Sequence, residues 1–314
     1  MVKQMLSAAI IATSAICANG QSTVYMTRDI TPEALVKIYE AVGRNAEGNV
    51  AVKISTGEAG GHNYLKPELI KDLVKKVDGT IVECNTAYAG RRNTTEEHLK
   101  VVHEHGFDRI AKVDIMDAEG DIKLPVRDST HIKYNLVGSH LTDYDFLINL
   151  AHFKGHAMAG MGGVLKNQSI GVASSAGKAY IHSAGVTADV DEAWSHIDNQ
   201  DGFLESMASA AQSVADHFGD KILYINVMNN LSVDCDCDSH PADPEMKDIG
   251  ILASTDPVAL DQACLELVYS VHPTHGNDNR PLIERIESRH GNHTIDHAEK
   301  IGLGSKKYTL KSID

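Results

Sequence analysis

Strand-like and helix-like patterns of apolar residues alternate along the first half of the chain. Short runs rich in valine and isoleucine, such as NVAVKIST, are typical of strands, and the segments between them place apolar residues on one helical face. Thr31 and Pro32 indicate a helix start, because threonine caps free amides and proline is tolerated at the first helical position. The expected strands lie at residues 22–27, 49–56, 79–87 and 110–117.

Strands separated by helices form βαβ units, whose strands run parallel in one sheet. The pattern therefore predicts an α/β fold with a mostly parallel sheet and flanking helices. Two short runs, IKLPV and IKYNLVG, predict a hairpin or an added edge. We expect residues 21–314 to form a single domain, with two lobes, a site between them and a lobe boundary near 185–200. Further elements are expected at 144–151 (strand), 201–219 (helix), 221–233 (strand), 277–289 (helix) and 294–302 (helix).

The first 20 residues have the pattern of a secretory signal. Lys3 precedes an apolar run from Leu6 to Ala18, and small residues then lead to Gln21. This pattern predicts that residues 1–20 are a signal peptide and that the protein is exported to a periplasmic or extracellular space. The alternative is a buried N-terminal helix. The apolar run is too short for a comfortable membrane span, and no later run reaches 18 apolar residues.

The charge and the aromatic content argue against nucleic acid as a partner. The net charge is −14, whereas phosphate binding needs a basic surface. The chain also has a single tryptophan and only 5% aromatic residues, too few to suggest stacking platforms for bases. A small-molecule ligand is therefore the expected partner.

The segment from His152 to His182 concentrates reactive residue types directly after the buried strand at 144–151. It reads HFKGHAMAGMGGVLKNQSIGVASSAGKAYIH. Open α/β sheets bind ligands at the carboxyl ends of their strands, so we expect a functional loop here. The alternative is a tight loop whose histidines cap helix ends. The candidate catalytic residues are His156, Lys166 and His182, and Gly162, Gly163 and Asn167 are candidates for ligand binding.

Loops after two earlier strands carry further candidates for the same pocket. GEAGGHNYLKP follows the second strand and contains His62, and CNTAYAGRRNT follows the third and contains Asn85, Arg91 and Arg92. Arginine binds carboxylate or phosphate through two parallel hydrogen bonds. The alternative for the arginines is a pair solvated on a surface loop.

Cys235 and Cys237 form a C-x-C pair flanked by aspartates. In an extended segment both thiols can face one side, so the pair could be half of a metal site. Two cysteines with histidine would suit zinc, and thiolate-rich sites also suit iron. The alternatives are a reversible disulfide or two free thiols on a loop. The candidate metal ligands in this segment are Cys235 and Cys237, with His240 close by.

Three segments together resemble a bacterial family named domain of unknown function 362. These are HFKGHAMAGMGGVLKNQSIGVASSAGKAYIHS, NVMNNLSVDCDC and DIGILASTDPVALDQA, and the resemblance covers almost all of the chain after residue 20. Many relatives carry a ferredoxin module with two C-x2-C-x2-C-x3-C runs and are labelled iron–sulfur proteins. This sequence has no such run, so the resemblance implies no two-cluster ferredoxin.

The order His156, a glycine cluster, Lys166 and His182 is also similar to the nickel-pincer lactate racemase superfamily. That similarity implies a pyridinium-derived cofactor attached to Lys166, nickel bound by His182, and His156 as the acid or base. His62 is the only candidate for a second proton-transfer histidine. Nickel therefore joins zinc and iron as an expected metal.

The sequence as a whole predicts an exported metal-binding protein that carries out redox or proton-transfer chemistry on a small anionic metabolite. The alternative is a carrier or sensor that binds a metal or ligand without catalysis.

Overall fold

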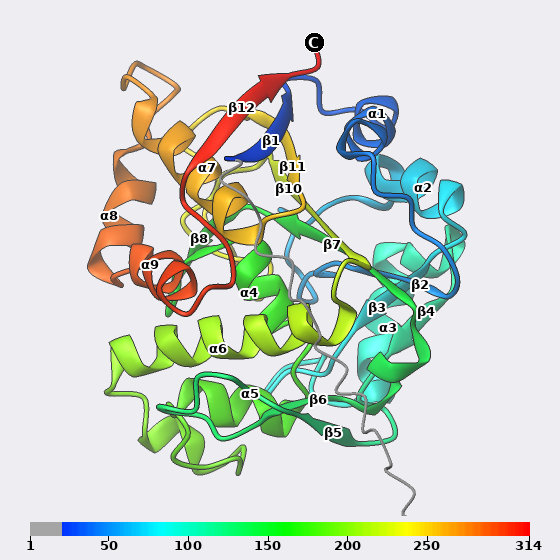
Figure 1. Ribbon diagram of the computed structural model, residues 1–314, viewed down its shortest axis with the longest axis vertical. Coiled ribbons are helices and arrows are strands. Elements are labelled where there is room, and N and C mark those ends of the chain that lie inside the picture. Colours follow the sequence, from blue (N-terminus) through cyan, green and yellow to red (C-terminus); the bar gives the residue numbers. More distant parts are fainter. Residues whose placement is uncertain (1–20) are drawn as a thin grey trace, which may run out of the picture.

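An eight-stranded sheet runs through the computed structural model, which describes residues 21–314 (Figure 1). The predicted signal peptide at residues 1–20 lies outside the described residues. The strands follow one another across the sheet in the order β12-β1-β11-β10-β7-β2-β3-β4. Their bounds are β1 (Ser22–Thr27), β2 (Val50–Lys53), β3 (Thr80–Glu83), β4 (Val113–Ile115), β7 (Phe146–His152), β10 (Ile222–Met228), β11 (Gly250–Ser254) and β12 (Tyr308–Ser312).

The sheet is mostly parallel, as the alternating pattern predicted. Strand β11 runs antiparallel to both of its neighbours, and the other pairs of adjacent strands are parallel. The central strands β7 and β10 are buried along their whole length. Parallel strands covered on both faces are expected to be continuously apolar, and FLINLAH and ILYINVM largely are.

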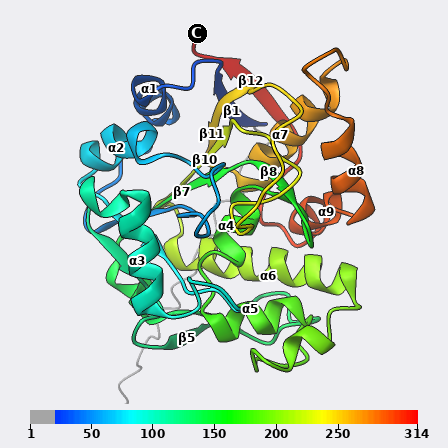
Figure 2. The ribbon, with the colours of Figure 1, turned by 180° about the vertical axis from the view of Figure 1, so that it is seen from behind.

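Helices cover both faces of the sheet (Figure 2). On one face, α1 (Pro32–Val42), α2 (Pro67–Lys76) and α3 (Thr95–His105) pack against apolar side chains such as Val52, Ile148 and Ile225. On the other face, α4 (Val164–Ser169), α6 (Gln200–Phe218) and α7 (Pro257–Ser270) pack against the opposite side of the same strands. The remaining α-helices are α5 (Ser175–His182), α8 (Arg280–Ser288) and α9 (Asn292–Lys300).

Local signals for helix starts and for the hairpin are confirmed. The Thr31 hydroxyl accepts a hydrogen bond from the Ala34 amide at 3.1 Å at the start of α1. The predicted hairpin is the antiparallel pair β5 (Asp121–Leu124) and β6 (Asn135–Gly138). Single-turn 3₁₀ helices lie at η1 (Phe107–Arg109), η2 (Ser139–Asp143) and η3 (Ala193–Ser195). The two-lobe division near 185–200 stays a prediction.

The segment 152–182 is more ordered than the loop that the sequence predicted. It contains the antiparallel pair β8 (Lys154–His156) and β9 (Gly160–Gly162), followed by α4 and α5. These elements are three to eight residues long, too short to show a periodic pattern. Within residues 21–314, no helix has both the length and the hydropathy that crossing a bilayer requires.

Candidate functional site

A cavity of about 670 Å³ lies where the carboxyl ends of four parallel strands meet. Its lining includes Glu58 after β2, Tyr88 after β3, His156 after β7 and Cys237 after β10. Parallel strands bring their following loops to the same edge of a sheet, and the cavity lies at the edge where the sequence predicted a site. A cavity of this size accommodates a small metabolite.

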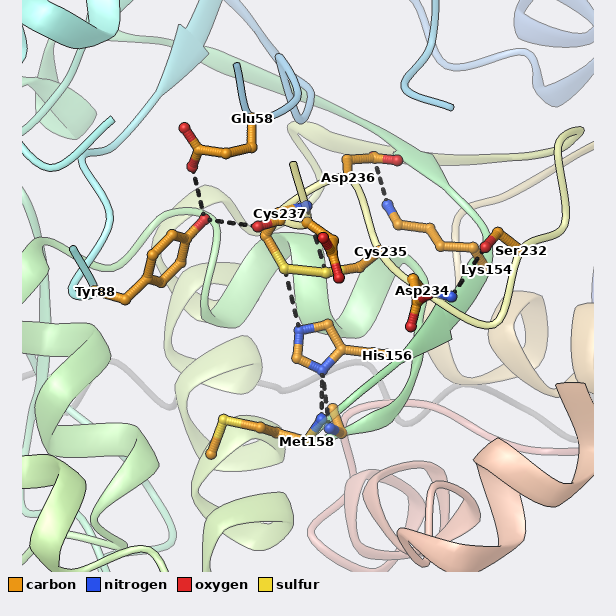
Figure 3. Close-up of a disulfide and its surroundings, with 12 residues drawn as sticks. Glu58, Tyr88, Lys154, His156, Met158, Ser232, Asp234, Cys235, Asp236 and Cys237 are labelled. Carbon is orange, nitrogen blue, oxygen red and sulfur yellow. Dashed lines mark hydrogen bonds and ion pairs between the residues drawn. A yellow bond between two sulfur atoms is a disulfide. The ribbon is translucent and has the colours of Figure 1, made fainter. Parts of the chain in front are cut away.

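His156 presents a nitrogen-bound proton to this cavity. Its Nδ1 accepts hydrogen bonds from the backbone amides of Met158 at 3.1 Å and Ala159 at 2.9 Å. An amide can only donate, so Nδ1 is unprotonated and the neutral ring carries its proton on Nε2. Burial, followed by the positive charge of Lys166, holds the pKa of His156 well below its ordinary value. The ring is therefore neutral at neutral pH, and its Nε2 lies 3.8 Å from the Cys237 sulfur (Figure 3).

His182 has the opposite tautomer to His156. Its Nδ1 donates to the Lys178 carbonyl oxygen one helical turn earlier, at 2.7 Å. The ring stacks on Phe203, with centroids 4.7 Å apart. Burial lowers the pKa of His182 to about 4, so the ring is neutral and its Nε2 keeps a free lone pair. One lining histidine is thus a hydrogen-bond donor and the other an acceptor.

Lys166 lines the same cavity from α4. Its ammonium makes no hydrogen bond or ion pair with another residue in the described part of the chain. Burial lowers the pKa of Lys166 to about 7, and the nearby charges of Lys154 and Lys53 act in the same direction. A substantial fraction of the side chain is then a neutral amine at neutral pH, which is the reactive form of lysine.

Cys235 and Cys237 are joined in a disulfide on the cavity wall (Figure 3). Of the alternatives that the sequence left open, the structure has the disulfide. The closest His156 nitrogen and the two sulfurs all lie within 4.8 Å of one another, so this group could hold one metal ion. It would first have to be reduced, because metals bind thiolates. The Nε2 proton of His156 would also have to move.

The set of residues that could hold a metal ion differs from the predicted set. Among the described residues, His156 stands beside the two cysteines in place of His182. His182 nevertheless has the better prepared nitrogen, because a backbone carbonyl fixes its tautomer and leaves Nε2 as an acceptor.

Asp236, between the two cysteines, anchors their loop. Its buried carboxylate accepts hydrogen bonds from His152 Nδ1 at 2.8 Å and from Lys154 Nζ at 2.7 Å. Burial opposes ionisation, but His152 and Lys154 outweigh it and hold the pKa of Asp236 well below its usual range. The loop is therefore tied to the strand end that leads into β8.

Another wall is a charged network of Arg92 with Lys53, Glu58 and Glu83, and the sequence analysis named only Arg92 of these. Lys53, at the end of β2, lies 3.0 Å from Glu83, at the end of β3. The buried Arg92 guanidinium contacts Glu58 at 3.2 Å and Glu83 at 3.5 Å. The charges of Lys53 and Arg92 outweigh burial and lower the pKa of Glu83 to about 2. The sequence feature that could have revealed the Lys53–Glu83 pair is the charged residue at the end of each apolar strand, in VAVK and TIVE.

Residues 50–266 match the model of the family described as domain of unknown function (DUF362). The chain belongs to this family. No curated protein matches the sequence.

Two solved structures are similar to this DUF362 chain. The lactate racemase apoprotein from Thermoanaerobacterium thermosaccharolyticum is 15% identical with a TM-score of 0.44, over 79% of this chain and 57% of that one. A protein from Thermotoga maritima is 12% identical with a TM-score of 0.44, over 86% of this chain and 58% of that one. The chain thus spans less than three fifths of either structure's length.

The DUF362 chain brings only some of the predicted ligand-binding residues to the cavity. Arg92, Gly162, Gly163 and Asn167 line it. Asn167 is held in place by bonds with Lys53. Gly163 is required because a Cβ there would lie 2.4 Å from an Asp261 carboxylate oxygen.

The other predicted ligand-binding residues point elsewhere. His62 is not a lining residue, and its side chain is 56% exposed and pairs with Asp243. Asn85 is buried behind the wall and donates to Thr95. Arg91 borders the cavity, but its guanidinium binds Glu104 on the surface. Loop paths decide these directions, and sequence spacing does not reveal them.

Proposed function

We propose that this DUF362 protein is an exported enzyme that carries out proton-transfer or redox chemistry on a small anionic metabolite held in the cavity. One observation carries the proposal. His156 offers an N–H and His182 a lone pair to the same buried space, so a base and a hydrogen-bond donor that stabilises developing negative charge can act on one ligand.

The lining cations support an anionic ligand. Lys53 and Lys154 already have carboxylate partners, Glu83 and Asp236. Lys166 has no such partner among residues 21–314, and Lys178 donates only to the Ala173 carbonyl oxygen. Buried charges are stable when paired, and a bound carboxylate or phosphate would supply the missing counter-charge.

The roles follow from the hydrogen bonds. The His182 Nε2 lone pair would remove a proton, and the His156 Nε2–H would donate a hydrogen bond to the substrate oxygen on which negative charge develops. Lys166 would bind the anion as an ammonium, and as a neutral amine it could act as a second base or as a nucleophile.

The metal part of the proposal concerns the reduced protein. With the disulfide opened, the sulfurs of Cys235 and Cys237 and an imidazole could hold zinc, iron or nickel. A metal ion bound there would polarise a substrate oxygen. Metal analysis of protein purified with and without reductant tests this part. Absence of stoichiometric metal in both samples would contradict it.

Anion binding and proton transfer are tested separately. Calorimetric titration with a panel of small carboxylates should show binding that falls at least tenfold in Lys166→Met. The same change at Lys76, whose ion pair with Glu40 is half-exposed, should have no effect. Absence of binding to wild type, or binding unchanged in Lys166→Met, would overturn the anion site.

Proton transfer should appear as exchange of a substrate C–H for deuterium in D₂O, followed by NMR. The exchange should be lost in His182→Gln and His156→Leu. A bound carboxylate that exchanges no proton in wild type would support the non-catalytic carrier instead.

Export is supported by the signal pattern of residues 1–20 and by the disulfide, because disulfides persist in oxidising compartments. Intact-mass measurement of the secreted or periplasmic fraction tests this. The mature chain is expected to begin at Asn19 or Gln21, and a full-length cytosolic protein would contradict export.

A further inference from the structure

The Cys235–Cys237 disulfide is poorly suited to stabilising the fold. The two cysteines are only two positions apart in the sequence. A disulfide stabilises mainly by restricting the unfolded chain, and this effect is smallest for the shortest loops. The loop is already held by Asp236 through His152 and Lys154. The disulfide therefore contributes little to the stability of the fold. It lies on the wall of the cavity, where it can meet a reagent.

Each sulfur of the pair faces a hydrogen-bond donor. The Cys237 amide donates to the Cys235 sulfur at 3.4 Å, and the Nε2–H of His156 points to the Cys237 sulfur at 3.8 Å. Such donors stabilise negative charge on a sulfur when the disulfide opens. Cys235 is buried, whereas Cys237 is half-buried, which favours the Cys237 sulfur as the point of attack for an incoming reagent.

The other two cysteines among residues 21–314 provide an internal contrast. Cys84 and Cys264 are buried free thiols; Cys84 borders the cavity, but only 2% of it is exposed and its thiol donates to the Val172 carbonyl oxygen at 3.3 Å. Burial raises the pKa of Cys84 and of Cys264 above the ordinary range, which keeps both in the unreactive thiol form. Within the described part of the chain, the Cys235–Cys237 pair therefore differs from both free thiols, which burial keeps protonated.

We propose that Cys235 and Cys237 are a redox-active dithiol–disulfide couple that exchanges two electrons with an external dithiol reductant. This inference is independent of the proposed proton transfer. A thiolate of the reductant attacks the Cys237 sulfur, the Cys235–Cys237 bond breaks, and Cys235 leaves as a thiolate beside the Cys237 amide. The second thiolate of the reductant then attacks the reductant's other sulfur, which is bonded to Cys237 in the mixed disulfide. This step closes the reductant's disulfide and releases the Cys237 thiolate beside His156.

The electrons and protons of this exchange balance. The pair gains two electrons and takes up two protons from water, while the dithiol loses two electrons and two protons as it becomes a disulfide. His156 is a positioning residue here, since it keeps its Nε2 proton and only donates a hydrogen bond to the released thiolate.

The first experiment uses dithiothreitol as the probe on the folded full-length protein. Treated protein is alkylated with N-ethylmaleimide and mapped by mass spectrometry, while circular dichroism monitors the fold. Cys235 and Cys237 should both be labelled in folded protein, with Cys84 and Cys264 unlabelled. Removal of dithiothreitol in air should restore the disulfide. A disulfide that opens only when the protein unfolds would overturn the proposal, as would purified protein with two thiols and stoichiometric metal.

The second experiment measures the equilibrium constant for reduction in glutathione buffers, where structural disulfides resist reduction. Wild type should reach a measurable mixture of both forms. His156→Leu should shift the constant toward the disulfide by about fivefold to tenfold, the size of one lost hydrogen bond. His156→Gln, which keeps an N–H, should recover part of the shift. His62→Leu is the control, because His62 is exposed and does not line the cavity. An unchanged constant in His156→Leu would overturn the role of His156.

Discussion

The Asp261 carboxylate on α7 accepts hydrogen bonds from the Val164 and Leu165 amides, at 3.0 Å each, and so caps the helix that carries Lys166. Helix α4 has only six residues and no side-chain cap at its own N-cap position. Asp261→Asn would leave one buried amide without an acceptor, so we expect a loss of about 2 kcal/mol in unfolding free energy at pH 7. Urea unfolding measures this loss. Asp220→Asn, at an exposed site, should change stability by less than about 0.5 kcal/mol.

The same carboxylate predicts a pH dependence. Burial raises the pKa of Asp261 to about 6, above the value of about 3.9 expected in the unfolded chain. Between these two values the folded protein holds a proton that the unfolded chain has lost, so this group's contribution to stability falls as pH rises. The stability difference between wild type and Asp261→Asn should therefore be about 2 kcal/mol larger at pH 4 than at pH 7. A difference that does not vary with pH would contradict the raised pKa.

Lys166 should be the lysine most reactive toward a small acylating reagent near neutral pH. The pKa of Lys166 is lowered to about 7 by burial, below the ordinary lysine value of about 10.4. Competitive acetylation with acetic anhydride, mapped by mass spectrometry, should show the Lys166 rate rising through about pH 7. The exposed Lys37 serves as the comparison, and its profile should differ from that of Lys166. Equal profiles for the two lysines would show that Lys166 is an ordinary charged side chain.

The buried pair of Lys53 and Glu83 should contribute strongly to stability. Both side chains are at most 5% exposed, and removing one partner leaves a buried charge. Lys53→Met should lower the free energy of unfolding, measured with urea, by about 3 kcal/mol. The loss should not be larger, because Arg92 still contacts Glu83. The half-exposed pair of Lys76 and Glu40 provides the control, and Lys76→Met should cost less than about 1 kcal/mol. Similar losses in the two variants would contradict the importance of burial.

Asp236 should control the order of the cysteine loop. Asp236→Asn weakens the bonds to His152 and Lys154, so amide hydrogen exchange in residues 234–239 should become at least tenfold faster. Exchange in β10 should be unaffected. Asp238→Asn, in the same loop but exposed, is the matched control. Unchanged exchange in Asp236→Asn would show that the disulfide alone orders the loop.

The sequence predicted elements where a local pattern decides the structure. The Thr31 cap and the continuous apolar run of β7 depend on neighbouring residues and on burial in a central strand, and both are confirmed. Helix α4 was missed because Asp261, almost a hundred positions later in the chain, caps it. A short helix stabilised from a distance leaves no local signature.

The general position of the site was also predictable, because the loops after parallel strands meet at one edge of a sheet. Which side chains enter the cavity was not. His62 and Asn85 come from suitable loops, yet one faces solvent and the other lies behind the wall. The direction of a loop side chain depends on the backbone path, which packing with other segments decides.

The sequence alone determined the α/β alternation, the reactive segment from His152 to His182 and the proximity of two cysteines. Only the tertiary structure decided that two backbone amides place the His156 proton on Nε2 and that a carbonyl places the His182 proton on Nδ1. It also decided that His156 faces the Cys235–Cys237 disulfide. Residue type limits which chemistry is available, but protonation and pairing depend on hydrogen bonds and burial, which exist only after distant segments have packed together.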